Sequence, residues 1–127
     1  MFEKVQDINK EKNAIALYIS LVGGNYKKLS PSDVDFRLLN DAGSLTGYAE
    51  VKVLSTSMRE AFPLTVEARK IIKLRDKRLR AIMIWYCLDG ILYSSIENLK
   101  GESFWDETSG ELMLSYKDKK TFKYVRA

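Results

Sequence analysis

Two acidic residues and a lysine, Asp35, Glu50 and Lys52, lie in two neighbouring segments that alternate polar with apolar residues. Residues two apart in a β-strand share a face, so Glu50 and Lys52 point to one side of their strand and Val51 points to the other. Carboxylates bind hard divalent cations, and an amine stabilises an anionic transition state. The spacing therefore predicts metal-assisted hydrolysis of phosphodiester bonds.

The turn between the two segments decides which residues face each other. It carries Asn, Asp, Gly and Ser, which suit a tight reversal. If residues 42–43 form a two-residue loop, Leu39 pairs with Thr46 and Asp35 lies directly across from Glu50. The Cβ atoms of such a pair are about 4.5–5.5 Å apart. Two carboxylates at that distance repel each other unless a cation lies between them, so the register favours a metal site.

An aspartate, a gap of fourteen residues and then Glu-x-Lys is the pattern at Asp35, Glu50 and Lys52. This pattern resembles the core motif of the PD-(D/E)XK nuclease superfamily. The expected order of elements is similar too, over roughly residues 1–97: a helix, the two motif strands, a second helix and a further strand. The resemblance implies a restriction-endonuclease-like or junction-resolvase-like fold.

Two acidic positions have alternatives. Val34 stands before Asp35, where the superfamily commonly has a proline, and this departure leaves Asp33 as an alternative to Asp35. The superfamily often contributes a further acid from its first helix. Glu11 occupies the matching position, and Asp7, one turn earlier, is its alternative.

The resemblance also implies a mechanism and a substrate. Asp35, Glu50 and the backbone carbonyl of Val51 would bind Mg²⁺ or Mn²⁺, with Glu11 as a further metal ligand. Lys52 would position the attacking water. The implied substrate is DNA, cut by an endonuclease that acts as a homodimer. The alternative is a nuclease-like fold without turnover, used as a nucleic-acid-binding or assembly subunit.

Basic residues are concentrated in one segment, residues 69–80, which holds seven lysines and arginines and one acid. Residues 64–77 have the period of an amphipathic helix. On that helix Lys70, Lys73 and Lys77 gather opposite the apolar side. Lysines in such a stripe can contact the phosphates of a nucleic acid without reading its sequence. The stripe is therefore the predicted DNA-binding surface.

The composition excludes several other chemistries. The chain has no histidine, which removes His-based general bases, Ser-His-Asp triads and most zinc sites. Its one cysteine, Cys87, has no partner for an internal disulfide, which favours a reducing, cytoplasmic location. No apolar run approaches the ~18 residues of a membrane span. The length of 127 residues fits one domain, 1–127.

The pattern of elements predicts an α/β (α+β) fold with an αβββαβ core, in which helices flank one mixed sheet. Gly23 and Gly24 end the first helix, and Asp89-Gly90 joins two apolar strands. A further β-hairpin is expected at the C-terminal end. The expected helices are 2–20 and 64–77, the strands after the motif are 81–88 and 91–96, and the C-terminal hairpin is 111–116 with 121–125.

Overall fold

A computed structural model describes the backbone of residues 5–29 and 35–127, and the side chains of residues 9–29 and 35–127. Asp33 and the side chain of Asp7, the two alternative acids, lie outside the described residues. The element order is α1, β1 to β4, α2, β5 to β9, with short 3₁₀ turns after β6 and β8.

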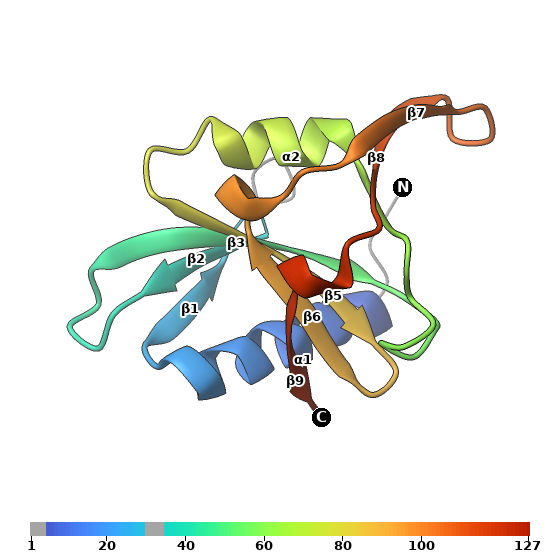
Figure 1. Ribbon diagram of the computed structural model, residues 1–127. Coiled ribbons are helices and arrows are strands. Elements are labelled where there is room, and N and C mark those ends of the chain that lie inside the picture. Colours follow the sequence, from blue (N-terminus) through green and yellow to red (C-terminus); the bar gives the residue numbers. More distant parts are fainter. Residues whose placement is uncertain (1–4, 30–34) are drawn as a thin grey trace.

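The core of the fold is a mixed six-stranded sheet in the order β1-β2-β3-β5-β6-β9 (Figure 1). Only β3 and β5 are parallel neighbours, and the other pairs are antiparallel. The predicted mixed-sheet α/β fold is therefore confirmed. The strands are β1 (Asn25–Lys28), β2 (Phe36–Leu39), β3 (Leu45–Val53), β5 (Arg80–Cys87), β6 (Gly90–Ser95) and β9 (Lys123–Arg126).

One α-helix covers each face of this sheet (Figure 1). Helix α1 (Val5–Val22) buries Ile15 and Tyr18 against one face, and α2 (Ala68–Arg75) packs Ile71 and Leu74 against the other. Helix α1 stops before Gly23, whose positive φ of 82° suits glycine, as the sequence predicted. Neither helix has the length and apolar character that a bilayer-spanning helix requires, within the described part of the chain.

The predicted helix over 64–77 is wrong at both ends. Its first four residues form strand β4 (Leu64–Glu67), in which Leu64 and Val66 are fully buried and the residues between them are not. This alternation has a period of two, which suits a strand. Helix α2 starts only at Ala68 and ends at Arg75, so Lys77 follows it.

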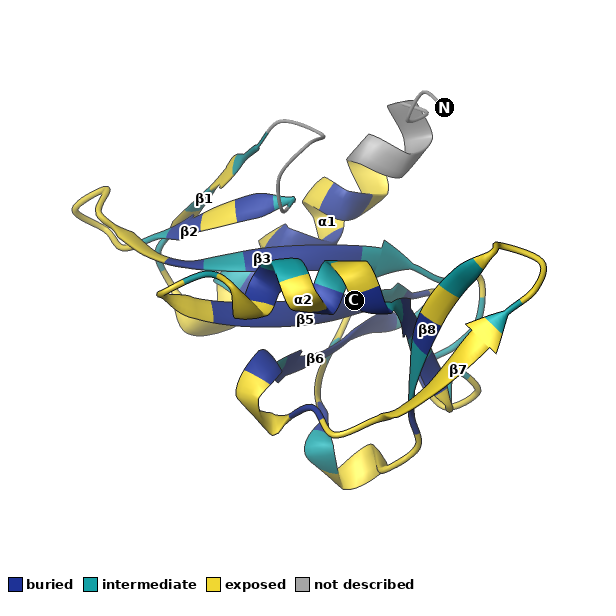
Figure 2. Cartoon of the chain, turned by 90° about the horizontal axis from the view of Figure 1, so that it is seen from above, coloured by how far each residue is buried: buried dark blue, intermediate teal, exposed yellow. Residues whose placement is uncertain are grey.

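Strand β4 belongs to a second, three-stranded sheet in the order β4-β8-β7. The other two strands, β7 (Glu102–Asp106) and β8 (Glu111–Tyr116), form a C-terminal hairpin with an exposed outer strand (Figure 2). A hairpin was expected here, but the pairing of 111–116 with 121–125 is wrong. Strand β9 joins β6 in the large sheet instead, after a 3₁₀ turn in which the Asp118 side chain accepts from the Lys120 N–H.

The β2–β3 hairpin keeps the predicted register where it matters for the site. Phe36 pairs with Ala49, which is the same register as the predicted alignment of Asp35 with Glu50. Near the turn the prediction is wrong, since Leu39 pairs with Leu45 rather than with Thr46. The loop is one residue longer than expected, and a β-bulge opposite Leu38 and Leu39 restores the register.

The longer loop follows from the side chain of Asn40. Its Oδ1 accepts from the backbone N–H groups of Ala42 and Ser44. The Asn40 carbonyl accepts from the N–H of Gly43, which has a positive φ of 84°. These bonds define a tight turn followed by a left-handed glycine, the usual three-residue hairpin loop.

Candidate active site

Asp35 and Glu50 hold each other at the end of the β2–β3 hairpin. The Asp35 N–H donates to Glu50 Oε2 at 3.0 Å, and the Val51 N–H donates to Asp35 Oδ2 at 2.8 Å. The backbone ladder of these strands ends at the Phe36–Ala49 pair. Just beyond it, the two carboxylates accept the N–H groups that would otherwise continue the ladder. The predicted pair of acids is therefore brought together.

The backbone of Val51 also faces this pair. In a β-strand, the N–H and C=O of one residue point to the same side, toward the same neighbouring strand. Since the Val51 N–H donates to Asp35, its carbonyl points toward the Asp35 side of β3 as well. Two carboxylates and one main-chain carbonyl thus border the same space.

Three lysines connect these acids to two others. Lys28 Nζ lies 3.2 Å from Glu11 Oε2 and 3.6 Å from Asp35 Oδ1. Lys70 Nζ lies 3.8 Å from Glu50 Oε1 and 3.4 Å from Glu67 Oε2, and Lys52 Nζ lies 3.7 Å from Glu67 Oε1. The predicted residues Glu11, Asp35, Glu50, Lys52 and Lys70 all belong to one charged network.

Lys52 is anchored on β4. Its Nζ donates to the Thr65 carbonyl at 2.9 Å and to Thr65 Oγ1 at 3.3 Å. Trp85 Nε1 donates to the same carbonyl at 3.0 Å from inside the core. Burial lowers the pKa of Lys52, and the nearby Glu67 carboxylate opposes this effect. Hydrogen bonds therefore fix the position of the Lys52 amine, and its proton affinity is lowered.

Glu50 is a buried carboxylate whose charged form is disfavoured by its surroundings. Only 4% of its surface is exposed. Burial, and then the charge of Asp35, raise its pKa from the usual 4.5 to about 7, although Lys70 and Lys73 act in the opposite direction. The nearby lysines do not fully offset the effects of burial and of the Asp35 charge on Glu50. A divalent cation at this position would relieve the imbalance.

Comparisons with known proteins identified no relative of this chain. The chain matched no protein-family model, no curated protein and no solved structure. The resemblance to the PD-(D/E)XK superfamily therefore stays a hypothesis, and the site is interpreted from its own chemistry.

The donor set suits a hard cation with few protein ligands. No group of three His, Cys, Asp or Glu side chains converges within the described residues. Mg²⁺ commonly takes one or two carboxylates and keeps several waters. Asp35, Glu50 and the Val51 carbonyl match that requirement, and a cation bound there would favour the charged form of Glu50, whose pKa is raised by burial and by the Asp35 charge. Glu11 lies behind Lys28 and reaches the pair through that lysine.

The lysine stripe lies over β3 rather than in open solvent. Lys70 forms an ion pair with Glu50, and the charge of Lys73 lowers the pKa of Glu50. Lys77 Nζ lies 4.7 Å from the ring centre of Tyr48. The helical wheel expected from the sequence places Ile72 and Leu79 on the apolar side, and this is wrong, because these side chains are 57% and 42% exposed.

Three residues of the network were missed in the sequence: Lys28, Thr65 and Glu67. Thr65 and Glu67 were assigned to a helix. The alternation of apolar and polar residues in Leu64-Thr65-Val66-Glu67 instead indicates a strand, in which the side chains of Thr65 and Glu67 lie on the same face. Lys28 lies on β1, and no local signal in the sequence connects it to Asp35.

We expect Trp85→Phe to lower the free energy of unfolding by about 2 kcal/mol, because it removes a buried hydrogen bond and part of a core side chain. The matched control is Trp105→Phe, since Trp105 is 61% exposed. Urea denaturation of the two variants measures the difference. Equal stability of both would contradict a supporting role of Trp85 behind Thr65.

Proposed function

We propose that this protein is a Mg²⁺- or Mn²⁺-dependent endonuclease of the PD-(D/E)XK type that hydrolyses phosphodiester bonds in DNA. The observation that carries the proposal is the mutual hydrogen bonding of Asp35 and Glu50 at the end of β3. It is joined by Lys52, two residues beyond Glu50 on the same strand face. Acid, acid and lysine in this arrangement are the groups that such a reaction uses.

Each residue has a distinct task in this proposal. Asp35, Glu50 and the Val51 carbonyl hold the cation, which when bound lowers the pKa of water and neutralises charge on the phosphate. Lys52, held by Thr65, orients the attacking water and donates to the anionic transition state. Its lowered pKa eases proton exchange with that water.

The lysines on and after α2 supply the DNA contacts. Lys70, Lys73 and Lys77 follow β3 from Glu50 toward Tyr48, so a backbone that crosses the acids would continue along them. The proposed assembly is a homodimer in the cytoplasm, since cleavage of both strands needs two sites. The single cysteine, Cys87, is buried and unpaired, which agrees with a reducing location.

We expect Lys73→Gln to weaken DNA binding and to reduce the slope of log K against log salt by about 0.9, the value for one lost phosphate contact. Lys12→Gln, on the exposed side of α1, is the control and should leave the slope unchanged. Fluorescence anisotropy at several salt concentrations measures both. An unchanged slope for Lys73→Gln would remove this lysine from the binding surface.

Cleavage of supercoiled plasmid tests the proposal. The wild-type protein should cut DNA with Mg²⁺ or Mn²⁺ and not with EDTA. Asp35→Asn and Glu50→Gln should each be inactive, whereas Glu60→Gln, at an exposed position, should cut normally. Failure of the wild-type protein to cut duplex, branched, nicked and single-stranded DNA with either metal would overturn the proposal.

One observation favours the second candidate, a nuclease-like domain that binds nucleic acid without cutting it. Lys28 and Lys70 already contact the carboxylates of Asp35 and Glu50. These amines could replace the cation permanently. DNA binding that is unaffected by Mg²⁺, together with no cleavage, would support this candidate.

A further inference from the structure

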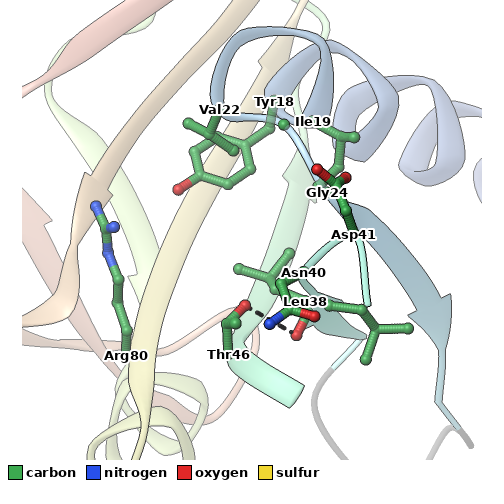
Figure 3. Close-up of a pocket in the computed structure, with 11 residues that line it drawn as sticks. Tyr18, Ile19, Val22, Gly24, Leu38, Asn40, Asp41, Thr46 and Arg80 are labelled. Carbon is green, nitrogen blue, oxygen red and sulfur yellow. Dashed lines mark hydrogen bonds between the residues drawn. The ribbon is translucent and has the colours of Figure 1, made fainter. Parts of the chain in front are cut away.

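A cavity of about 310 Å³ lies at the end of the sheet opposite the acidic pair. It is bordered by the last turn of α1, the Gly23-Gly24 corner and the β2–β3 hairpin (Figure 3). Arg80, at its edge, pairs with Gly47 on β3, three residues before Glu50. At a rise of about 3.3 Å per residue, this places the cavity about 10 Å along the strand from Glu50.

Among the residues that the structure describes, the Arg80 guanidinium has no counter-ion. In the residues from 9 to 29 and from 35 onward, no carboxylate oxygen lies within 4.0 Å of it. Its side chain lies on the α1 face of β5, as do Ile82 and Ile84. Arg80 also borders a smaller hollow that contains Tyr93 and Lys123. A planar cation in such a place is suited to a bidentate oxyanion.

Tyr18 presents a second donor that no described residue uses. Its side chain is 2% exposed, yet its hydroxyl makes no hydrogen bond within the described part of the chain. Among those residues, Tyr116 carries the only side-chain polar atom that is sealed in the core without a partner. The Tyr18 hydroxyl therefore reaches solvent through the cavity, and in Figure 3 it points toward the side where Arg80 lies.

Burial raises the pKa of Tyr18, although Arg80 opposes this effect. The phenol is thus a hydrogen-bond donor at neutral pH. Thr46 lines the same space, where its hydroxyl bonds to the Leu38 carbonyl (Figure 3). The Asp41 carboxylate lies on the side away from Arg80 and would repel an anion there, so the anion-binding part is confined to the Arg80 end.

We infer that this cavity binds a phosphate group, with the Arg80 guanidinium and the Tyr18 hydroxyl as its donors. The apolar lining of the cavity, which includes Ile19, Val22 and Leu38, would contact the organic part of a phosphate monoester. The phosphate can belong to a small molecule or to the end of a nucleic-acid strand, because the donors are the same for both. This inference does not depend on the proposed nuclease activity.

Titration of the 127-residue chain with inorganic phosphate, followed by NMR chemical shifts, tests the inference. The loss of one hydrogen bond to a charged group weakens binding about tenfold. Tyr18→Phe, which keeps the ring, should show that loss, and Arg80→Gln at least as much. Arg59→Gln, at an exposed position, should bind as the wild type does. Absence of binding to the wild type, or equal affinity of all four proteins, would overturn the inference.

Two further probes distinguish the sources of the phosphate. Arg80-dependent binding of adenosine monophosphate that is tighter than binding of inorganic phosphate supports a small-molecule site. Arg80-dependent preference for a 5′-phosphorylated oligonucleotide over its unphosphorylated form supports a strand-end site. Neither probe requires cleavage, so a failure here can be told apart from a failure of the Asp35–Glu50 assignment.

Discussion

Replacing Lys52 with methionine should reduce metal-dependent DNA cleavage at least about a hundredfold, the usual cost of losing one preorganised donor to a transition state. The affinity for Mn²⁺ should change little, because Asp35, Glu50 and the Val51 carbonyl stay in place. This separation of chemistry from metal binding is specific to the assigned role of Lys52. A purely structural lysine would not produce it.

The fold should tolerate this change. Methionine can occupy the same partly buried position, and replacing a buried amine by an apolar group of similar size often costs little. Lys12→Met, on the exposed side of α1, is the control for the change in charge. Plasmid cleavage and calorimetric titration with Mn²⁺ measure the two properties. Wild-type cleavage rates in Lys52→Met would exclude this lysine from the reaction.

The second large effect concerns Glu50 and pH. In the unfolded chain Glu50 titrates near its usual 4.5, and in the folded protein near 7. The folded state therefore binds more protons between these values, so the stability of the metal-free protein falls as pH rises through this window. A rise from 4.5 to about 7 corresponds to a cost of about 3 kcal/mol above pH 7.

Glu50→Gln removes this cost. We expect the variant to exceed the wild type by about 2 kcal/mol at pH 8 in EDTA, since the lost contact with Lys70 offsets about 1 kcal/mol. At pH 5 the two proteins should differ much less. Saturating Mg²⁺, at about 100 times its dissociation constant, should stabilise the wild type at pH 8 by about 2.7 kcal/mol and leave the variant unchanged.

Urea denaturation at both pH values, with and without Mg²⁺, measures these differences. Glu60→Gln is the control, because this residue is exposed and lies outside the site. A stability difference between wild type and Glu50→Gln that is the same at pH 5 and pH 8 would contradict the raised pKa of Glu50.

The motif strands were predictable because their information is local. The alternation around Asp35 and Glu50 gives the shared face, and a hairpin then fixes the pairing. The turn prediction failed because the Asn40 side chain accepts two backbone N–H groups and lengthens the loop. The β-bulge next to the turn, opposite Leu38 and Leu39, compensates for the longer loop and restores the register. Composition alone does not reveal such a bulge.

The remaining parts of the site depend on contacts between distant segments. Lys28 reaches Asp35 from β1, and Glu67 reaches Lys52 from β4. Strand β4 exists because β8, almost fifty residues later, pairs with it. A helical period over 64–77 could not reveal that partner. Four residues were therefore assigned to the wrong element.

The most direct test of the central claim is an anomalous difference map from crystals soaked in Mn²⁺. The account predicts one strong peak about 2.1 Å from oxygens of both Asp35 and Glu50, close to the Val51 carbonyl. A map with no peak there, in which Lys28 and Lys70 still contact the two carboxylates, would contradict it.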